Sequence, residues 1–185
     1  DYIFKVMLDG ISSPDSLVEK NKVAFITFNY DRLLESWLFR RIKYSFGIND
    51  AAALDVLRAI PIQHVYGTLG TFPPTHEPHS WILASQGIRT IFDTEHDETV
   101  LSAAVALLTT AQVICFLGFG FHRENIELLG LADHARACKG LVASSRYQIF
   151  DQEWSRLMRP FSGIDIKHAH FTHKNLEAIR HLPIF

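Results

Sequence analysis

The hydrophobic residues of the chain fall into short apolar runs separated by longer segments with helical spacing. The short runs are rich in β-branched and aromatic residues, which predicts strands at residues 23–28, 61–67, 112–117, 140–145 and 164–169. Helical spacing predicts helices that begin at residues 14 and 123 and that span residues 31–45, 50–59, 81–92, 100–111, 151–158 and 174–182. This alternation predicts a doubly wound α/β fold, in which helices flank a mainly parallel sheet with right-handed crossovers.

The most informative stretch is the strand-turn-helix segment that begins at residue 23. Its run Val-Ala-Phe-Ile-Thr-Phe contains no charge, as is typical of a strand buried on both faces of a parallel sheet. Ligands of such sheets bind beyond the carboxyl ends of the strands, and here that position is taken by Asn29 and Asp31. An alternative is that one of these side chains only caps the following helix by accepting a backbone N–H bond.

Two further strand ends carry candidate site residues. His64 and Tyr66 lie two residues apart on the second predicted strand, so their side chains face the same side of the sheet. A strand histidine can also be a hydrogen-bonded structural residue. The third strand passes into Gly118, Phe119 and Gly120 ahead of a helix, an order that lets a backbone approach a phosphate or ribose but that also suits a simple tight turn.

Composition limits the classes of function. With 185 residues and 48% hydrophobic content, the chain can bury the core of one domain, which we expect to span residues 1–185. The formal net charge of −2 shows no basic excess for nucleic acid, and no apolar run approaches the roughly 20 residues of a membrane span. We therefore expect a cytoplasmic protein without membrane or nucleic-acid partners. The abrupt start in the apolar residues 3–8 leads us to expect a piece of a longer chain.

Candidate metal ligands are scattered along the sequence. The chain has 2 cysteines, Cys115 and Cys138, which cannot form a disulfide framework or a four-cysteine zinc site. The acidic residues 93–98 precede a predicted helix, where the helix macrodipole favours negative charge. Histidines in a long loop or near a presumed sheet edge are His76, His79, His168, His170 and His173. We expect no metal site.

Three segments together resemble signatures of the sirtuin-like fold. They are Thr27–Glu35 (TFNYDRLLE), His64–Leu69 (HVYGTL) and Phe116–Ile126 (FLGFGFHRENI). Their order and their placement between strands and helices match over roughly residues 20–145. More narrowly, the segments are similar to the bacterial sirtuin-like domains of anti-phage defence proteins.

The resemblance implies a Rossmann-like, NAD-binding domain that splits the bond between nicotinamide and ribose. Asn29 would position the ribose and the attacking water, and His64 would act as general base or orient the ribose hydroxyls, which requires both to end neighbouring parallel strands. Nicotinamide leaves as a neutral base from an oxocarbenium-like centre, so the reaction needs positioning groups and one base rather than a strong nucleophile. The resemblance assigns NAD binding to Thr27, Asp31, Tyr66, Gly118, Phe119, Gly120 and Asn125.

The sequence departs from the family pattern at three points. Tyr66 stands directly before Gly67, where the family usually has its histidine, and the opening strand with a Gly-Ala-Gly loop is missing. The 2 cysteines cannot build the four-cysteine zinc module of the family's deacylases, which disfavours protein deacylation. We predict an NAD-hydrolysing effector domain of a larger, homo-oligomeric protein. The alternatives are a degenerate sirtuin-like module for nucleotide binding or assembly, and an unrelated α/β enzyme.

Overall fold

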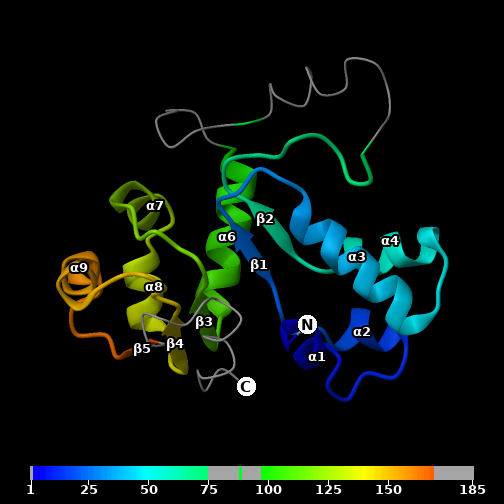
Figure 1. Cartoon of the computed structure of the whole chain (residues 1–185), viewed down its shortest axis with the longest axis horizontal. Coiled ribbons are helices and arrows are strands. Elements are labelled where there is room, and N and C mark those ends of the chain that lie inside the picture. Colours follow the sequence, from blue (N-terminus) through cyan, green and yellow to red (C-terminus); the bar gives the residue numbers. More distant parts are fainter. Residues whose placement is uncertain (1, 75–87, 89–96, 169–185) are drawn as a thin grey trace. The chain divides into compact units, whose positions relative to one another are not determined.

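The computed structural model describes residues 2–74, 88 and 97–168, and the chain divides into two compact units (Figure 1). The first unit holds Ile3–Ser102 and the second begins at Ala103, so the division falls within helix α6 (Glu98–Thr110). Each unit has a parallel sheet of its own. That residues 1–185 form a single domain stays a prediction from the sequence.

Local sequence signals set the helix boundaries of the first unit. Its elements before α6 are α1 (Tyr2–Met7), α2 (Pro14–Lys20), β1 (Phe25–Thr27), α3 (Leu33–Phe46), α4 (Asp50–Arg58) and β2 (Ile62–His64). Ser13 caps α2 by accepting the N–H of Ser16, and Pro14 occupies the first turn, where a missing N–H breaks no helical bond. Gly47, with a φ of 62°, ends α3 in the left-handed conformation that glycine adopts without strain.

The two strands of the first unit are parallel neighbours, as the sequence predicts. Thr27 lies opposite His64 in the register of β1 and β2. The Val65 N–H donates to the Thr27 carbonyl at 2.9 Å, which continues the pairing one residue past β2. The residues that follow β1 therefore meet the end of β2 at one edge of the sheet.

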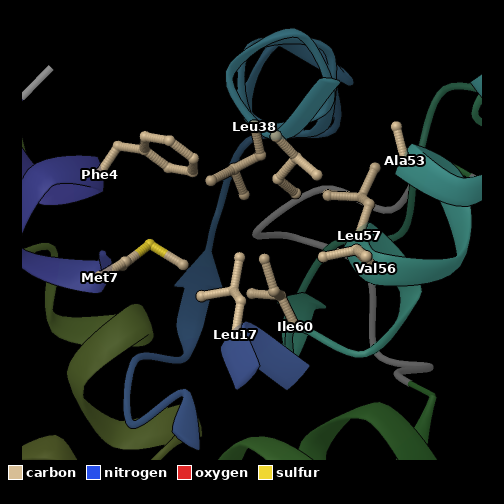
Figure 2. Close-up of a cluster of buried hydrophobic side chains, with 9 residues drawn as sticks. Phe4, Met7, Leu17, Leu38, Ala53, Val56, Leu57 and Ile60 are labelled. Carbon is tan, nitrogen blue, oxygen red and sulfur yellow. The ribbon is translucent and has the colours of Figure 1, made fainter. Parts of the chain in front are cut away.

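A hydrophobic core holds α3 in the first unit. Figure 2 shows Leu38 of α3 among side chains from neighbouring helices, including Phe4, Leu17 and Leu57. The buried residues of this core are Phe4, Met7, Leu17, Leu38, Ile42, Ala53, Val56, Leu57 and Ile60. Burying one such large side chain contributes roughly 1.5–3 kcal/mol. The core thus fixes α3, and with it Glu35 in the first turn of that helix.

The second unit is built on three parallel strands. After α6 its elements are β3 (Val113–Phe116), α7 (Arg123–Leu128), α8 (Leu131–Ala137), β4 (Leu141–Ser144), α9 (Asp151–Leu157), the 3-10 turn η1 (Arg159–Phe161) and β5 (Ile166–His168). The strands pair in the order β3-β4-β5. Gly140 precedes β4 where an added Cβ would lie 2.0 Å from the Gln112 carbonyl oxygen, so the entry to this strand requires glycine.

The α/β fold with parallel sheets flanked by helices is confirmed. The five predicted strands are present among the described residues, although they are shorter than the apolar runs and pair in two sheets rather than one. Helix α8, which follows α7 after Gly130, is an element that the sequence pattern did not separate. The Asp97 carboxylate accepts the N–H groups of Thr99 and Val100 at 2.9 and 3.3 Å, so this acidic residue stabilises the start of α6, as expected.

Several predictions from the sequence fall outside the described residues. They concern the helix expected in residues 81–92, of which only residue 88 is described, the helix at residues 174–182, the acidic residues 93–96, and His76, His79, His170 and His173. In the part of the chain that the structure does describe, no helix combines the length and apolar character needed to cross a membrane.

Candidate functional site

The turn between β1 and α3 is shaped by its own polar side chains. The Thr27 hydroxyl accepts the Asn29 N–H at 3.1 Å, and the Asp31 carboxylate accepts the Leu33 N–H at 2.9 Å. Asp31 therefore satisfies the N–H of the first residue of α3, although the N-cap position itself is held by Arg32, which makes no side-chain capping bond. Asn29 is exposed, and its carboxamide makes no hydrogen bond to any described residue. The Asn29 carboxamide is thus a polar group of this turn that a ligand can reach.

The imidazole ring of His64 bridges the turn and the first turn of α3. His64 Nδ1 lies 2.8 Å from the Asn29 carbonyl oxygen, and Nε2 lies 2.8 Å from Glu35 Oε1. The ring and the carboxylate are both buried, with His64 6% and Glu35 5% exposed. Because a carbonyl oxygen only accepts hydrogen bonds, Nδ1 is the donor to Asn29. One side chain thus joins residues from β1, β2 and α3.

The neighbours of Glu35 shift the pKa of its carboxyl group in opposite directions. Burial raises the pKa of Glu35, but its hydrogen bond to His64 and the nearby charges of His64 and Arg32 outweigh burial and leave the pKa below its usual value. The Arg32 guanidinium donates to the same oxygen, Oε1, at 2.8 Å. Glu35 Oε1 thus faces two nitrogen-bearing groups, the His64 ring and the Arg32 guanidinium. Both ring nitrogens of His64 are engaged by neighbouring oxygen atoms, and the general-base role of His64 stays a prediction.

Tyr66 lies beside this bridge in the sequence but packs differently. Its side chain is buried, with 7% exposed, and its ring meets Phe28 edge to face with centroids 5.8 Å apart. Gly67 follows with a φ of 74°, and its N–H donates to the His64 carbonyl at 3.1 Å. Gly67 thus turns the chain directly after Tyr66, which with His64 was predicted to face one side of the sheet.

The second strand-to-helix turn lies between β3 and α7. Gly118 has a φ of 60°, which favours glycine, and its N–H donates to the Ser145 hydroxyl at 2.9 Å. This bond ties the turn to the residue that follows β4. The Phe119 ring stacks on Phe116 with centroids 5.6 Å apart and meets Phe121 edge to face at 4.9 Å. Backbone conformation, one hydroxyl and aromatic packing therefore hold this turn.

The residues predicted from the sequence fall into two groups. The first unit holds Thr27, Asn29, Asp31, His64 and Tyr66, and the second holds Gly118, Phe119, Gly120 and Asn125. Within the second group the glycines directly follow β3, whereas Asn125 is buried on α7 with 7% exposed. That the two groups contribute to one site stays a prediction.

The sequence motifs assign no separate role to Glu35 or Ser145. Glu35 closes the segment Thr27–Glu35, but in the sequence it is only a carboxylate in the first turn of a helix. Ser145 had a weak signal, since it follows the fourth strand at its carboxyl end. Among residues 2–74, 88 and 97–168, no three His, Cys, Asp or Glu side chains gather as a metal site would require.

Comparison with known families identifies the chain. The family model of the SIR2-like domain matches residues 23–158, which is more than half of the sequence. The chain therefore belongs to the SIR2-like domain family, whose members use NAD and are generally NAD-dependent enzymes. No curated protein and no solved structure matches the chain. The resemblance to sirtuin-like domains is confirmed, and the narrower resemblance to anti-phage proteins stays a prediction.

Proposed function

We propose that this domain is an NAD glycohydrolase. In the reaction a water oxygen bonds to the ribose carbon while the bond to nicotinamide breaks, and NAD and water give nicotinamide, ADP-ribose and a proton. The observation that best supports the proposal is the exposed Asn29 carboxamide at the carboxyl end of a parallel strand. Membership of a family that uses NAD supplies the substrate class.

The residues of the chain suit this substrate. A carboxamide both donates and accepts hydrogen bonds, so Asn29 can hold a ribose hydroxyl and a water at once. Thr27 and Asp31 fix the backbone on either side of Asn29. In the second unit, the positive φ of Gly118 lets a backbone come close to a phosphate or sugar. We assign the remaining NAD contacts to Tyr66, Phe119, Gly120 and Asn125.

His64 has two candidate roles within this proposal. As a general base it would first have to release Glu35 or the Asn29 carbonyl, because both ring nitrogens are engaged. As an orienting group, His64 needs no such rearrangement, because its bond to the Asn29 carbonyl already holds the residue proposed to contact the sugar. Protein deacylation by a zinc-containing relative is disfavoured, since 2 cysteines cannot supply four thiolates.

Turnover of a fluorescent NAD analogue by the full-length protein tests the proposal. We expect Asn29→Ala to lower kcat by at least about 10²-fold, because a displaced positioning group has an effect of that order. We expect His64→Ala to lower kcat as well, whereas His134→Ala, a change on α8, should leave it unchanged. Turnover that survives Asn29→Ala in a folded protein would remove the proposal.

The alternative is a catalytically degenerate module that binds a nucleotide for sensing or assembly. It is favoured by Tyr66 in the place before Gly67 and by the engagement of both His64 nitrogens. Calorimetric binding of NAD without release of nicotinamide under any condition would support this alternative. In either case we propose a bacterial antiviral setting and a larger, oligomeric protein, on the strength of the sequence resemblance alone.

A further inference from the structure

The Asn29 turn is tied to helix α3 by a chain of two hydrogen bonds. The Asn29 carbonyl accepts from His64 Nδ1, and His64 Nε2 meets Glu35 Oε1, each at 2.8 Å. We propose that Glu35 is a positioning residue that, through His64, sets where the Asn29 carboxamide stands. The inference rests on the proposed function, because it assumes that Asn29 touches the substrate.

The hydrogen bonds of His64 restrain the position of the turn that contains Asn29. Glu35 lies on α3, which the hydrophobic core holds in place, whereas Asn29 lies in the exposed turn before that helix. His64 is anchored by its pairing opposite Thr27. The His64 ring thus joins two fixed elements, α3 and β2, to the backbone carbonyl of the exposed turn. Since the ring is buried, water cannot replace a lost bond without opening the fold.

The buried charged cluster of Arg32, Glu35 and His64 leaves some of its polar atoms without hydrogen bonds, which does not favour stability. Glu35 Oε2 and Arg32 Nε are buried without a hydrogen-bond partner among the described residues. Buried ion pairs generally contribute little more than well-packed apolar side chains of the same size. Local arrangements that violate the rules of polar satisfaction are expected mainly at functional sites. A positioning role accounts for keeping charged groups where an apolar cluster would pack as well.

Two conservative changes at position 35 separate length from charge. Glu35→Gln keeps the length, since its amide oxygen in the place of Oε1 can accept hydrogen bonds from both Arg32 and His64 Nε2. Glu35→Asp keeps the charge but is one methylene shorter, so the carboxylate withdraws from the ring. Positioning depends on whether the side chain at position 35 is long enough to contact the His64 ring. The glutamine variant should therefore resemble the wild type more closely than the aspartate variant does.

The test uses the full-length protein labelled with ¹⁵N-asparagine, with Glu19→Gln and Glu19→Asp on α2 as exposed controls. We expect Glu35→Asp to shift the Asn29 carboxamide resonance and to lower kcat about 10²-fold with KM little changed. Glu35→Gln should keep the resonance in place and retain most of kcat. The controls should match the wild type in both measurements.

Other results would overturn the inference. A carboxamide resonance that stays in place in Glu35→Asp shows that Glu35 does not position Asn29. A kcat retained in Glu35→Asp but lost in Glu35→Gln shows that charge matters and reach does not. Unfolding of both variants shows a structural role. If the wild type turns over no NAD, the proposed function fails, and the resonances still decide whether Glu35 positions Asn29.

Discussion

The turn from β1 to α3 is held by charged side chains, whereas the turn from β3 to α7 is held by backbone conformation and aromatic rings. Both turns follow a parallel strand and lead into a helix. In the first, Glu35 carries the bonds to His64 and Arg32. In the second, a glycine with positive φ donates to Ser145 beside stacked phenylalanines.

The difference determines what each turn is sensitive to. A turn held by a buried carboxylate depends on pH and on every member of its network, because each partner left behind is buried and unsatisfied. A turn held by a left-handed glycine depends on the residue type at that position and is indifferent to pH. The first turn is therefore suited to adjust the Asn29 side chain, and the second to present a rigid backbone.

The largest effect is expected from removing the carboxylate of the first turn. Glu35→Ala should lower the free energy of unfolding by about 3–5 kcal/mol, because it leaves the buried His64 ring and the Arg32 guanidinium without the carboxylate that they both contact. Urea denaturation measures this change. Glu19→Ala, on an exposed position, should stay within about 0.5 kcal/mol of the wild type. Equal effects of the two substitutions would mean that the charge network does not hold the turn.

The matching change in the second turn should have a smaller effect. Gly118→Ala places a side chain at a φ of 60°, which costs about 1–2 kcal/mol for an L-residue. Gly118→Asn should lose less, since asparagine tolerates the left-handed region better. Urea denaturation of both variants compares them. Alanine and asparagine variants of equal stability would show that the conformation of this backbone is not what requires glycine.

Low pH should affect the stability contributed by the first turn but not that contributed by the second. The folded-state pKa of Glu35 lies below its usual value of 4.5, so its contribution to stability is present above pH 4.5 and is lost as the pH falls below that value. The stability difference between wild type and Glu35→Gln should therefore shrink toward low pH, while the loss caused by Gly118→Ala should stay constant. Urea midpoints at several pH values test this, and parallel pH profiles of the two differences would contradict it.

The smallest expected effect concerns a thiol on the strand that leads into the glycine turn. Burial raises the pKa of Cys115 to about 11, so little thiolate is present near neutral pH and labelling should be slow. In a Cys138→Ser variant of this chain, Cys115 is the thiol that can be labelled. Adding Gly118→Ala should raise the labelling rate of Cys115 slightly, because this substitution strains the turn that follows β3. Absorbance with a chromogenic disulfide measures the rate. Wild-type labelling at the rate of a free peptide thiol would show that β3 opens readily.

The sequence predicts the fold better than the site because the fold depends on repeated local signals. Apolar runs mark all five described strands, and the cap at Ser13 marks the start of α2. The strand ends were harder to place: β1 covers only Phe25–Thr27 because β2, its pairing partner, is equally short. How many sheets the strands form depends on pairing over long sequence separations, which no local pattern records.

For the candidate site, the sequence predicts adjacency but not hydrogen bonding. It places Asn29 and His64 at the ends of neighbouring strands, and the structure has them there. It does not show that Glu35 meets the ring, since that contact depends on which side of α3 faces the end of β2 after packing. Nor does it show that both ring nitrogens are engaged, because this follows only from the acceptor atoms on either side.

A crystal structure of the full-length protein with bound ADP-ribose would show whether Asn29 holds the sugar. We expect the Asn29 carboxamide to hydrogen-bond to the ribose from which nicotinamide departs, with His64 still bridging the Asn29 carbonyl and Glu35. ADP-ribose bound in an ordered position that Asn29 does not touch would show that the carboxyl end of β1 is not the place where the sugar is held, and the proposed role of Asn29 would be wrong.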